Sequence, residues 1–257
     1  MGKHSRQVWE DFWDNKEDIH AVYSNNDRII NQVKKLDPVK DKWVMEIGAG
    51  SGRDGFKLVD MGARVILLDY AQSSLNVLKK LADEYHKPVV LVQGDAFALP
   101  FKTGSFQLVY HQGLLEHFTN PQDILAENYR VISPGGYTLA DVPQRYHLYT
   151  VVKHILIWMN KWFAGWETEF SIGQLGRLFT GVGFDIHDRY GDWMRPSFFY
   201  RALRQALLKV KIRLPLYPGP VPVLSPLGKW FGGLVRKTPL ALYTYMDIGV
   251  IGKKSGN

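Results

Sequence analysis

Short apolar runs alternate with amphipathic stretches along most of this chain. The apolar runs predict strands at 44–47, in the run that ends at Asp69, and at 89–92, 106–110, 137–142, 184–190 and 242–251. The amphipathic stretches predict helices at 53–61, 72–86, 121–132 and 171–181. Strands separated by helices indicate an α/β fold. We expect a Rossmann-like, doubly wound sheet of seven strands, mostly parallel, with strand seven antiparallel.

Three segments do not fit this alternation, and we expect them to form a lid. They are residues 1–40, 143–170 and 191–240. In the first, Trp9, Phe12 and Trp13 recur at helical spacing and predict an amphipathic cap helix. The other two follow strands five and six, so they leave the sheet at the edge where doubly wound folds bind ligands. Seven of the eight tryptophans lie in these segments, which favours a large apolar lid on a single domain spanning residues 1–257.

The net charge of +7 is concentrated in the C-terminal quarter of the chain. Residues 196–257 hold ten Lys and Arg against one acid, Asp247. Basic and apolar side chains are interleaved at 151–163 and 198–211, and a proline-rich apolar loop follows at 213–226. This combination is typical of helices that lie on an anionic membrane surface, here through residues 196–240. The alternatives are that the apolar faces pack onto the sheet, or that the basic residues bind an anionic substrate.

Composition excludes several kinds of site. The chain has no cysteine, which rules out disulfides, thiolate metal sites and a cysteine nucleophile, and no metal-ligand spacing is found. Nucleic acid is disfavoured as a partner, because prolines and aliphatic residues separate the basic residues. The charged first twenty residues hold no secretory signal, and no apolar run is long enough to span a membrane. We expect a cytoplasmic protein, with a peripheral membrane contact as the further hypothesis; the oligomeric state is left open.

The sequence WVMEIGAGSGR at 43–53 predicts a strand, a sharp glycine turn and the start of a helix. The helix N-terminus would point at a ligand on the turn. Asp69 ends the next strand, where an acid suits the two hydroxyls of a ribose. Residues 50–55 also fit the G-x-G-x-x-G pattern, which makes a nicotinamide enzyme the alternative.

Three further motifs indicate whether this site binds a nicotinamide dinucleotide or another nucleotide. GDAFALPF at 94–101 places Asp95 after strand three. HQGLLEH at 111–117 follows strand four, and RVISPGG at 130–136 leads into strand five. In order and spacing, the set from 43 to 142 resembles the class I S-adenosylmethionine-dependent methyltransferases. It is similar to the branch that includes quinone-biosynthesis, natural-product and surface-polysaccharide methyltransferases.

The resemblance implies S-adenosyl-L-methionine as the cofactor. The residues expected to bind it are Glu46, Gly48, Ala49, Gly50, Gly52, Arg53, Asp69, Tyr70, Asp95, Ala96, His111 and Gln112. Arg53 and the helix N-terminus would hold the carboxylate of the methionine half, although Arg53 as a solvated residue is the alternative. Glu46 would accept from the amino group or brace the turn. Asp69 would bind the ribose hydroxyls, and Asp95 would accept from the adenine amine.

Residues after strands four and five are candidates to act on the acceptor. His111 is the first candidate for a general base, with a backbone contact to the cofactor as the alternative. Tyr146 and His147, at the start of the second lid segment, are the other catalytic candidates. The pair Glu116-His117, which recurs in the family that the sequence resembles, is interpreted as structural.

Glu167 follows Trp166, and the two resemble an aromatic-acid pair of related methyltransferases. Glu167 is expected either to bind substrate or to cap the helix that begins after Ser171. The long insertion after strand six departs from the family, which weakens analogies about the substrate.

The expected function is methyl transfer from S-adenosylmethionine to a small acceptor. We place first a hydrophobic or membrane-associated acceptor, such as a quinone, an isoprenoid or a lipid. The alternatives are a polar metabolite or a sugar in polysaccharide or natural-product biosynthesis, and a non-catalytic S-adenosylmethionine-binding partner subunit. The sequence leaves open whether carbon, oxygen, nitrogen or sulfur is methylated.

Overall fold

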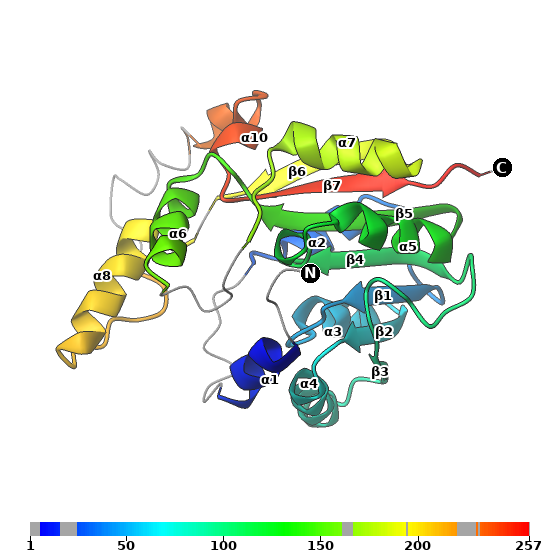
Figure 1. Cartoon of the computed structure of the whole chain (residues 1–257), viewed down its shortest axis with the longest axis horizontal. Helices are drawn as coiled ribbons and strands as arrows, with labels where there is room; N and C mark the ends of the chain where they lie inside the picture. The colour runs from blue at the N-terminus through cyan, green and yellow to red at the C-terminus, as the bar shows by residue number, and fades with distance from the viewer. Residues whose placement is uncertain are drawn as a thin grey trace.

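A seven-stranded sheet forms the centre of the molecule (Figure 1). The computed structural model describes residues 6–15, 25–160, 167–193, 195–219, 230 and 232–256. The strands are β1 (Trp43–Ile47), β2 (Arg64–Asp69), β3 (Val89–Gln93), β4 (Phe106–Gln112), β5 (Ile132–Pro143), β6 (Asp185–Asp192) and β7 (Asp247–Lys253). Their order is β3-β2-β1-β4-β5-β7-β6. β1 to β5 pair in parallel, and β7 runs antiparallel between β5 and β6, which confirms the predicted Rossmann-like fold.

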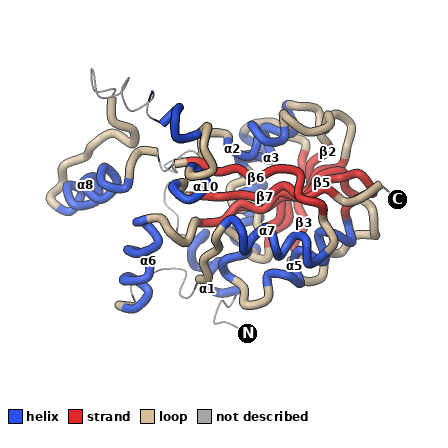
Figure 2. Tube along the Cα trace, turned by 90° about the horizontal axis from the view of Figure 1, so that it is seen from above, coloured by secondary structure: helices blue, strands red, loops and turns tan. Residues whose placement is uncertain are grey.

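Helices cover both faces of the sheet (Figure 2). One face packs against α2 (Arg28–Val33), α3 (Arg53–Asp60) and α4 (Gln72–Glu84). The other packs against α5 (Pro121–Val131) and α7 (Ile172–Val182). The inner strands β1 and β2 are buried almost throughout, which explains their continuous apolar runs. The edge strand β6 alternates between exposed and half-buried residues over its first five positions and buries Tyr190 and Asp192 near its end.

The remaining helices lie at or beyond the carboxyl ends of the parallel strands (Figures 1 and 2). They are α1 (Arg6–Asp14), the 3-10 helix η1 (Leu115–His117), α6 (Leu148–Trp158), α8 (Phe198–Lys209) and α10 (Ala241–Thr244). α1 packs beside α4, whereas α6 and α8 project past the sheet. In the described ranges, no helix is both long enough and apolar enough to cross a membrane.

Two predictions of secondary structure need correction. The strand expected from residue 242 begins only at Asp247, because Ala241–Thr244 forms the short helix α10. Ala241 and Tyr245 enter the core from this helix, so their apolar spacing is that of a helical turn. The segment of interleaved basic and apolar side chains at 151–163 belongs in part to α6, which begins at Leu148, and residues 161–166 lie outside the described residues. Its Lys153 is buried against two carboxylates, so this basic residue does not add to a charged surface.

Candidate active site

The backbone after β1 turns sharply at the carboxyl edge of the sheet. Gly48, Gly50 and Gly52 have φ angles of 65°, 55° and 63°, a region that glycine adopts without strain. A Cβ atom on Gly50 would lie 2.8 Å from the Trp13 ring of α1, and one on Gly52 would lie 2.6 Å from Leu78. Gly52 caps α3, so the positive end of this helix lies beside the turn. The turn therefore offers backbone N–H groups and a helix N-terminus to a carboxylate.

A cavity of about 440 Å³ opens at this turn. The ends of β1, β2 and β4, the loop after β3, and Trp9 and Trp13 of α1 form its walls. Of the residues predicted to bind the cofactor, all except Gly52 and His111 line it. Its volume lies within the range of small-molecule sites.

Asp69 ends β2, and its carboxylate holds the turn in place. Oδ2 accepts from the Gly50 N–H at 3.0 Å and from the Ser74 hydroxyl at 2.8 Å, and Oδ1 accepts from the Ala71 N–H at 3.0 Å. Burial raises the pKa of Asp69, and these hydrogen bonds oppose the rise because they favour the charged form. The Tyr70 N–H also favours the charged form of this carboxylate, and both Asp69 and Tyr70 line the cavity.

The loop after β3 forms a second wall of the cavity. Asp95 Oδ1 accepts from the Phe97 N–H at 2.9 Å, which closes a tight turn around Ala96. Phe97 packs edge-on against Phe118, with ring centroids 5.0 Å apart. An apolar slot with an exposed acid at its rim suits a flat heterocycle that carries an amino group.

Glu46 lies beside the glycine turn and is fully buried. Its Oε2 accepts from the Tyr110 hydroxyl at 2.8 Å. Burial, and then the charge of Asp54, raise the pKa of Glu46 to about 8. The carboxyl therefore holds its proton at neutral pH, and a cationic amino group beside it would favour loss of that proton.

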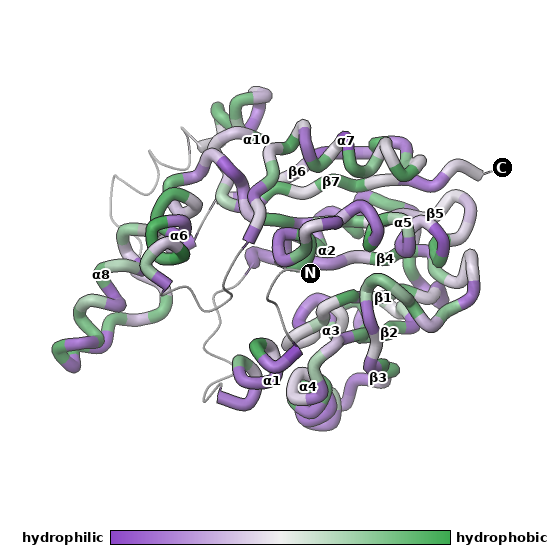
Figure 3. The backbone as a smooth tube through the Cα atoms, in the orientation of Figure 1, coloured by the Kyte–Doolittle hydropathy of each residue, from purple (hydrophilic) through white to green (hydrophobic). Residues whose placement is uncertain are grey.

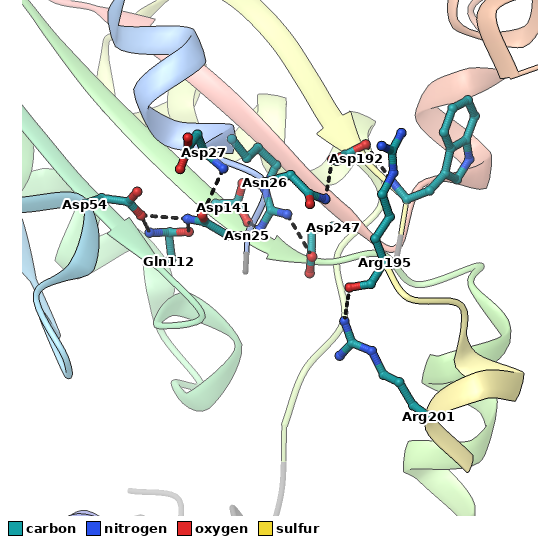
Figure 4. Close-up of polar contacts among 12 residues, drawn as sticks. Asn25, Asn26, Asp27, Asp54, Gln112, Asp141, Asp192, Arg195, Arg201 and Asp247 are labelled. Atoms are coloured by element: carbon teal, nitrogen blue, oxygen red, sulfur yellow. Dashed lines mark hydrogen bonds and ion pairs between the residues drawn. The ribbon is translucent and has the colours of Figure 1, made fainter. Parts of the chain in front are cut away.

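A cluster of amide and carboxylate side chains at the cavity was not predicted. Asn25 donates to Asp54 Oδ2 at 2.6 Å and to Gln112 Oε1 at 2.9 Å, and Gln112 Nε2 donates to the same Asp54 oxygen at 2.6 Å (Figure 4). Asp54 and Gln112 line the cavity. An acid in the first turn of α3 is a signal that marks Asp54, but nothing in the local sequence marks Asn25.

Arg28 continues this polar layer across the strand ends. Its guanidinium donates to both oxygens of Asp141 at 2.7 Å and lies 3.0 Å from Asp247 Oδ2. Burial alone would lower the pKa of Arg28, but the charges of Asp141 and Asp247 outweigh burial and raise this pKa above its ordinary value. Next to it, Asn26 donates to Asp192 Oδ2 at 2.9 Å (Figure 4). The start of α2 is thus bound to β5, β6 and β7.

Residues 45–140, which contain the glycine turn, Asp69 and most of the cavity wall, match a family model described as a methyltransferase domain. This match agrees with the predicted resemblance to the class I S-adenosylmethionine-dependent methyltransferases over that segment. The resemblance implies S-adenosyl-L-methionine as the cofactor. The residues present fit this cofactor, because the acid of β2, the open glycine turn and the loop after β3 lie around one cavity.

Curated relatives agree with this resemblance, and solved structures agree with the fold. The chain is 30% identical to a demethylmenaquinone methyltransferase of Lactococcus lactis over 51% of its length and 57% of the relative. It is 26% identical to a ubiquinone biosynthesis O-methyltransferase of Roseobacter denitrificans over 62% of its length and 66% of the relative. The chain thus spans less than two thirds of either relative. A chain of the complex between the Haloferax volcanii Trm112 methyltransferase activator and a putative methyltransferase has the same fold, with a TM-score of 0.63, 17% identity and 96% of both chains covered.

The side chain of His111 does not reach the cavity. Side chains alternate along β4, so Gln112 faces the cavity and His111 shares the face of Val109, beneath α5 and α7. His111 is fully buried, and neither ring nitrogen has a hydrogen-bond partner in the part of the chain that the structure describes. Burial lowers its pKa to about 3. The imidazole of His111 is therefore turned away from the cavity, which corrects the expected role as a general base, whereas the alternative of a backbone contact with the cofactor stays a prediction.

The other two catalytic candidates, Tyr146 and His147, also lie away from the cavity. His147 caps α6, because its Nδ1 accepts from the Tyr149 N–H at 3.1 Å. Tyr146 is 60% exposed and packs at a tilt against Tyr243, with ring centroids 6.3 Å apart. A catalytic role for either residue stays a prediction.

Two residues with expected structural roles have different surroundings. His117 lines the cavity. Glu167 does not cap α7, because Ser171 and Gln174 form a reciprocal capping box there. Instead, Glu167 lies 3.9 Å from His117 and 2.7 Å from Lys153. Among the described residues, no group of three or more His, Asp and Glu is placed to hold a metal ion.

Proposed function

We propose that this methyltransferase transfers a methyl group to a small apolar acceptor, such as a quinone, an isoprenoid or a lipid-like molecule. The observation that carries the proposal is the position of α6 and α8. They follow β5 and β6 at the edge that holds the cavity, and both expose large apolar side chains. The names of the curated relatives, which refer to menaquinone and ubiquinone biosynthesis, support the same class of acceptor.

The residues of the cavity would bind and shield the cofactor. S-adenosylmethionine supplies a methyl group on a positively charged sulfur, which leaves when the acceptor attacks. Asp69 would hold the ribose, the turn at Gly50 the methionine half, and Trp9 and Trp13 of α1 would exclude water. Because charge is neutralised rather than created at the sulfur, positioning and desolvation would supply most of the acceleration.

The exposed surface of α6 is unusually apolar for a helix at the edge of a domain. Val151, Ile155 and Met159 are about half exposed, and Trp158 is 87% exposed. Figure 3 shows green, hydrophobic stretches along both α6 and α8. Apolar patches of this kind mark contacts with ligands, proteins or membranes. We assign this one to the acceptor and the surface from which it comes.

The surface of α8 adds positive charge to apolar exposure. Phe199 is 72% exposed and Leu203 52%, and Lys209, Lys211 and Arg213 are exposed just after them. The other two basic residues have a different role, since Arg201 and Arg204 donate to the carbonyls of Arg195 and Leu214. Exposed lysines beside apolar side chains favour a peripheral contact with an anionic membrane surface.

The same surfaces support a lid on one methyltransferase domain. α1 lies at the cavity, and α6 and α8 lie beyond the strand ends. We propose that the segments 1–40, 143–170 and 191–240 together cover the acceptor. Residues 220–229, which include part of the proline-rich loop, lie outside the described residues.

Methyl transfer into fractionated extracts tests the acceptor. The purified chain and labelled S-adenosylmethionine would be added to a bacterial extract divided into lipid and aqueous fractions, with Asp69→Ala as the matched control. Label in the lipid fraction supports the proposal. Label in the aqueous fraction alone overturns the apolar acceptor in favour of a polar metabolite or a sugar. No transfer to either fraction would favour the partner-subunit alternative.

Vesicle flotation tests the membrane contact. The chain should float with vesicles of phosphatidylglycerol at low salt and remain below vesicles of phosphatidylcholine. Replacing Phe199 and Leu203 by Ser should abolish flotation, whereas Val90→Ser, an exposed apolar residue on β3, should not. Equal flotation of both variants would overturn the assigned surface.

A further inference from the structure

The ring of His117 forms part of the cavity wall beyond the end of β4. It is only 8% exposed, and Trp9 of α1 packs edge-on against it with ring centroids 5.0 Å apart. Gly113 and Leu114, which precede η1, line the cavity as well. An acceptor that enters the cavity would therefore meet an imidazole here.

A fixed carboxylate lies behind this ring. Glu167 Oε1 is 3.9 Å from His117 Nδ1, and Glu167 Oε2 lies 2.7 Å from Lys153 Nζ. The side chain of Lys153 has no exposed surface, and its Nζ also lies 3.0 Å from Glu169 Oε1. Burial alone would lower the pKa of Lys153, but the charge of Glu167 and the hydrogen bonds to both carboxylates raise it. The ammonium therefore stays charged and holds Glu167 in place beside the histidine.

Other ionisable groups surround the pair. They are Glu116 of η1, Tyr149, Lys153 and His154 of α6, Glu169 of the segment before α7, and Asp247 of β7. Burial, and then the charge of Glu167, raise the pKa of Glu116 well above its ordinary value. The same two causes raise the pKa of Tyr149. His154 lies at the outer end, 2.7 Å from Glu169. Of these groups, His117 lines the cavity, and an imidazole is the side chain suited to take up a proton near neutral pH.

We propose that His117 is the general base of the reaction and that Glu167 is the residue that positions it. The inference rests on the proposed methyl transfer and deepens it, because a base is needed only for an acceptor that gives up a proton. It assigns the acceptor to compounds with a hydroxyl group, such as hydroquinones and catechols. Their hydroxyl would donate to His117 Nε2, while Glu167 would accept from Nδ1–H.

In this step the atoms and charges balance. His117 takes the proton of the hydroxyl, and an electron pair of the oxygen forms the bond to the methyl carbon. The carbon–sulfur bond breaks with its pair going to sulfur, which becomes a neutral thioether. Glu167 stabilises the imidazolium until the proton passes to solvent. At 3.9 Å the carboxylate acts on the imidazolium through its charge, and hydrogen bonds between catalytic groups tighten when a substrate binds.

Two synthetic acceptors distinguish a general base at His117 from a residue that only positions the acceptor. A prenylated catechol must lose a proton, whereas the corresponding thiophenol is ionised at neutral pH. His117→Gln should lower kcat about a hundredfold for the catechol and less than about threefold for the thiophenol. Affinity for S-adenosylhomocysteine should not change. The matched control is His187→Gln, an exposed histidine of β6, which should alter none of these values.

The dependence of kcat on pH is a second test of the general base. It should differ between the wild type and His117→Gln only if His117 takes up the proton, not if its role is structural. With the wild type, kcat for the catechol should rise with pH and reach a plateau once His117 is neutral. With His117→Gln it should rise about tenfold per pH unit until the catechol itself ionises. Equal losses on both acceptors, or a plateau in the variant at the wild-type pH, would overturn the proposal.

An NMR titration of the imidazoles depends on no acceptor. With S-adenosylhomocysteine bound and the signal assigned through His117→Gln, the pKa of His117 should fall by about one unit in Glu167→Gln. A change below about 0.3 units would overturn the pairing. If the wild type methylates neither probe but the shift is found, the proposed acceptor class is overturned and the pair of His117 and Glu167 stands.

Discussion

The candidate active site has two halves that differ in what forms them. The half proposed to bind the cofactor, called the cofactor half, is made of backbone turns and loops at the ends of β1, β2 and β3, and its main side chain is Asp69. The half next to His117 is made of side chains from η1, α6 and the segment before α7, joined by the buried ion pairs of Lys153 with Glu167 and Glu169. Substitutions should therefore affect fold and binding differently in the two halves.

Backbone groups tolerate most changes of side chain around them, whereas a buried ion pair depends on both partners. In the cofactor half, substitution should reduce affinity for the cofactor and leave stability nearly unchanged. In the half next to His117, removal of one charge leaves another uncompensated in the interior, so stability should fall first.

Lys153→Met should produce the largest loss of stability. It removes the buried cation and leaves the carboxylates of Glu167 and Glu169 without it, which costs about 3–5 kcal/mol for pairs of this kind. Urea unfolding followed by circular dichroism measures the change. The control Lys209→Met removes an exposed lysine of α8 and should stay within about 0.5 kcal/mol of the wild type. Equal midpoints for the two variants would mean that the two halves do not differ in this way.

Asp69→Ala should weaken cofactor binding at least about tenfold, or about 1.4 kcal/mol. The variant loses the expected ribose ligand and the acceptor of the Gly50 N–H, while the strands and their core remain. Calorimetric titration with S-adenosylhomocysteine measures the affinity, and circular dichroism checks the fold. Asp83→Ala, an exposed acid of α4, is the matched control. An unchanged affinity would remove Asp69 from the cofactor site.

The same contrast explains what the sequence could predict. The cofactor half lies within residues 45–97, where each loop follows its strand directly, so strand runs and glycine spacing place Asp69 and Asp95 correctly at the cavity. Asn25 and Lys153 depend on partners far away in the chain, which no local pattern marks. His111 shows that a prediction can also fail by a single residue. Neighbouring side chains of a strand point to opposite faces of the sheet, so His111 points away from the cavity that Gln112 faces.

α1 is intermediate between the two halves, because it lies in the cofactor half but is attached to it by a side chain. Glu10 accepts from the N–H groups of Gln72 at 2.9 Å and Ser73 at 2.8 Å, at the start of α4. The N-cap residue of α4, Ala71, has no side chain that could do this. Partial burial would raise the pKa of Glu10, but the amides of Ser73 and Gln72 lower it to about 2. Glu10 thus fixes the helix that carries two cavity residues, Trp9 and Trp13.

Glu10→Gln should speed release of the cofactor product about fivefold, because a helix cap contributes about 1 kcal/mol. In the wild type, the pKa of Glu10 is lower when α1 is docked than its ordinary 4.5. The carboxylate therefore stabilises docking fully above pH 4.5, and this stabilisation is lost as the pH falls from 4.5 toward 2. Stopped-flow displacement of S-adenosylhomocysteine should show faster release of the wild type below pH 4.5, approaching the rate of Glu10→Gln. If Glu10→Gln releases the product at the wild-type rate at pH 7, α1 does not limit exchange, and the cofactor half depends on its backbone and Asp69 alone.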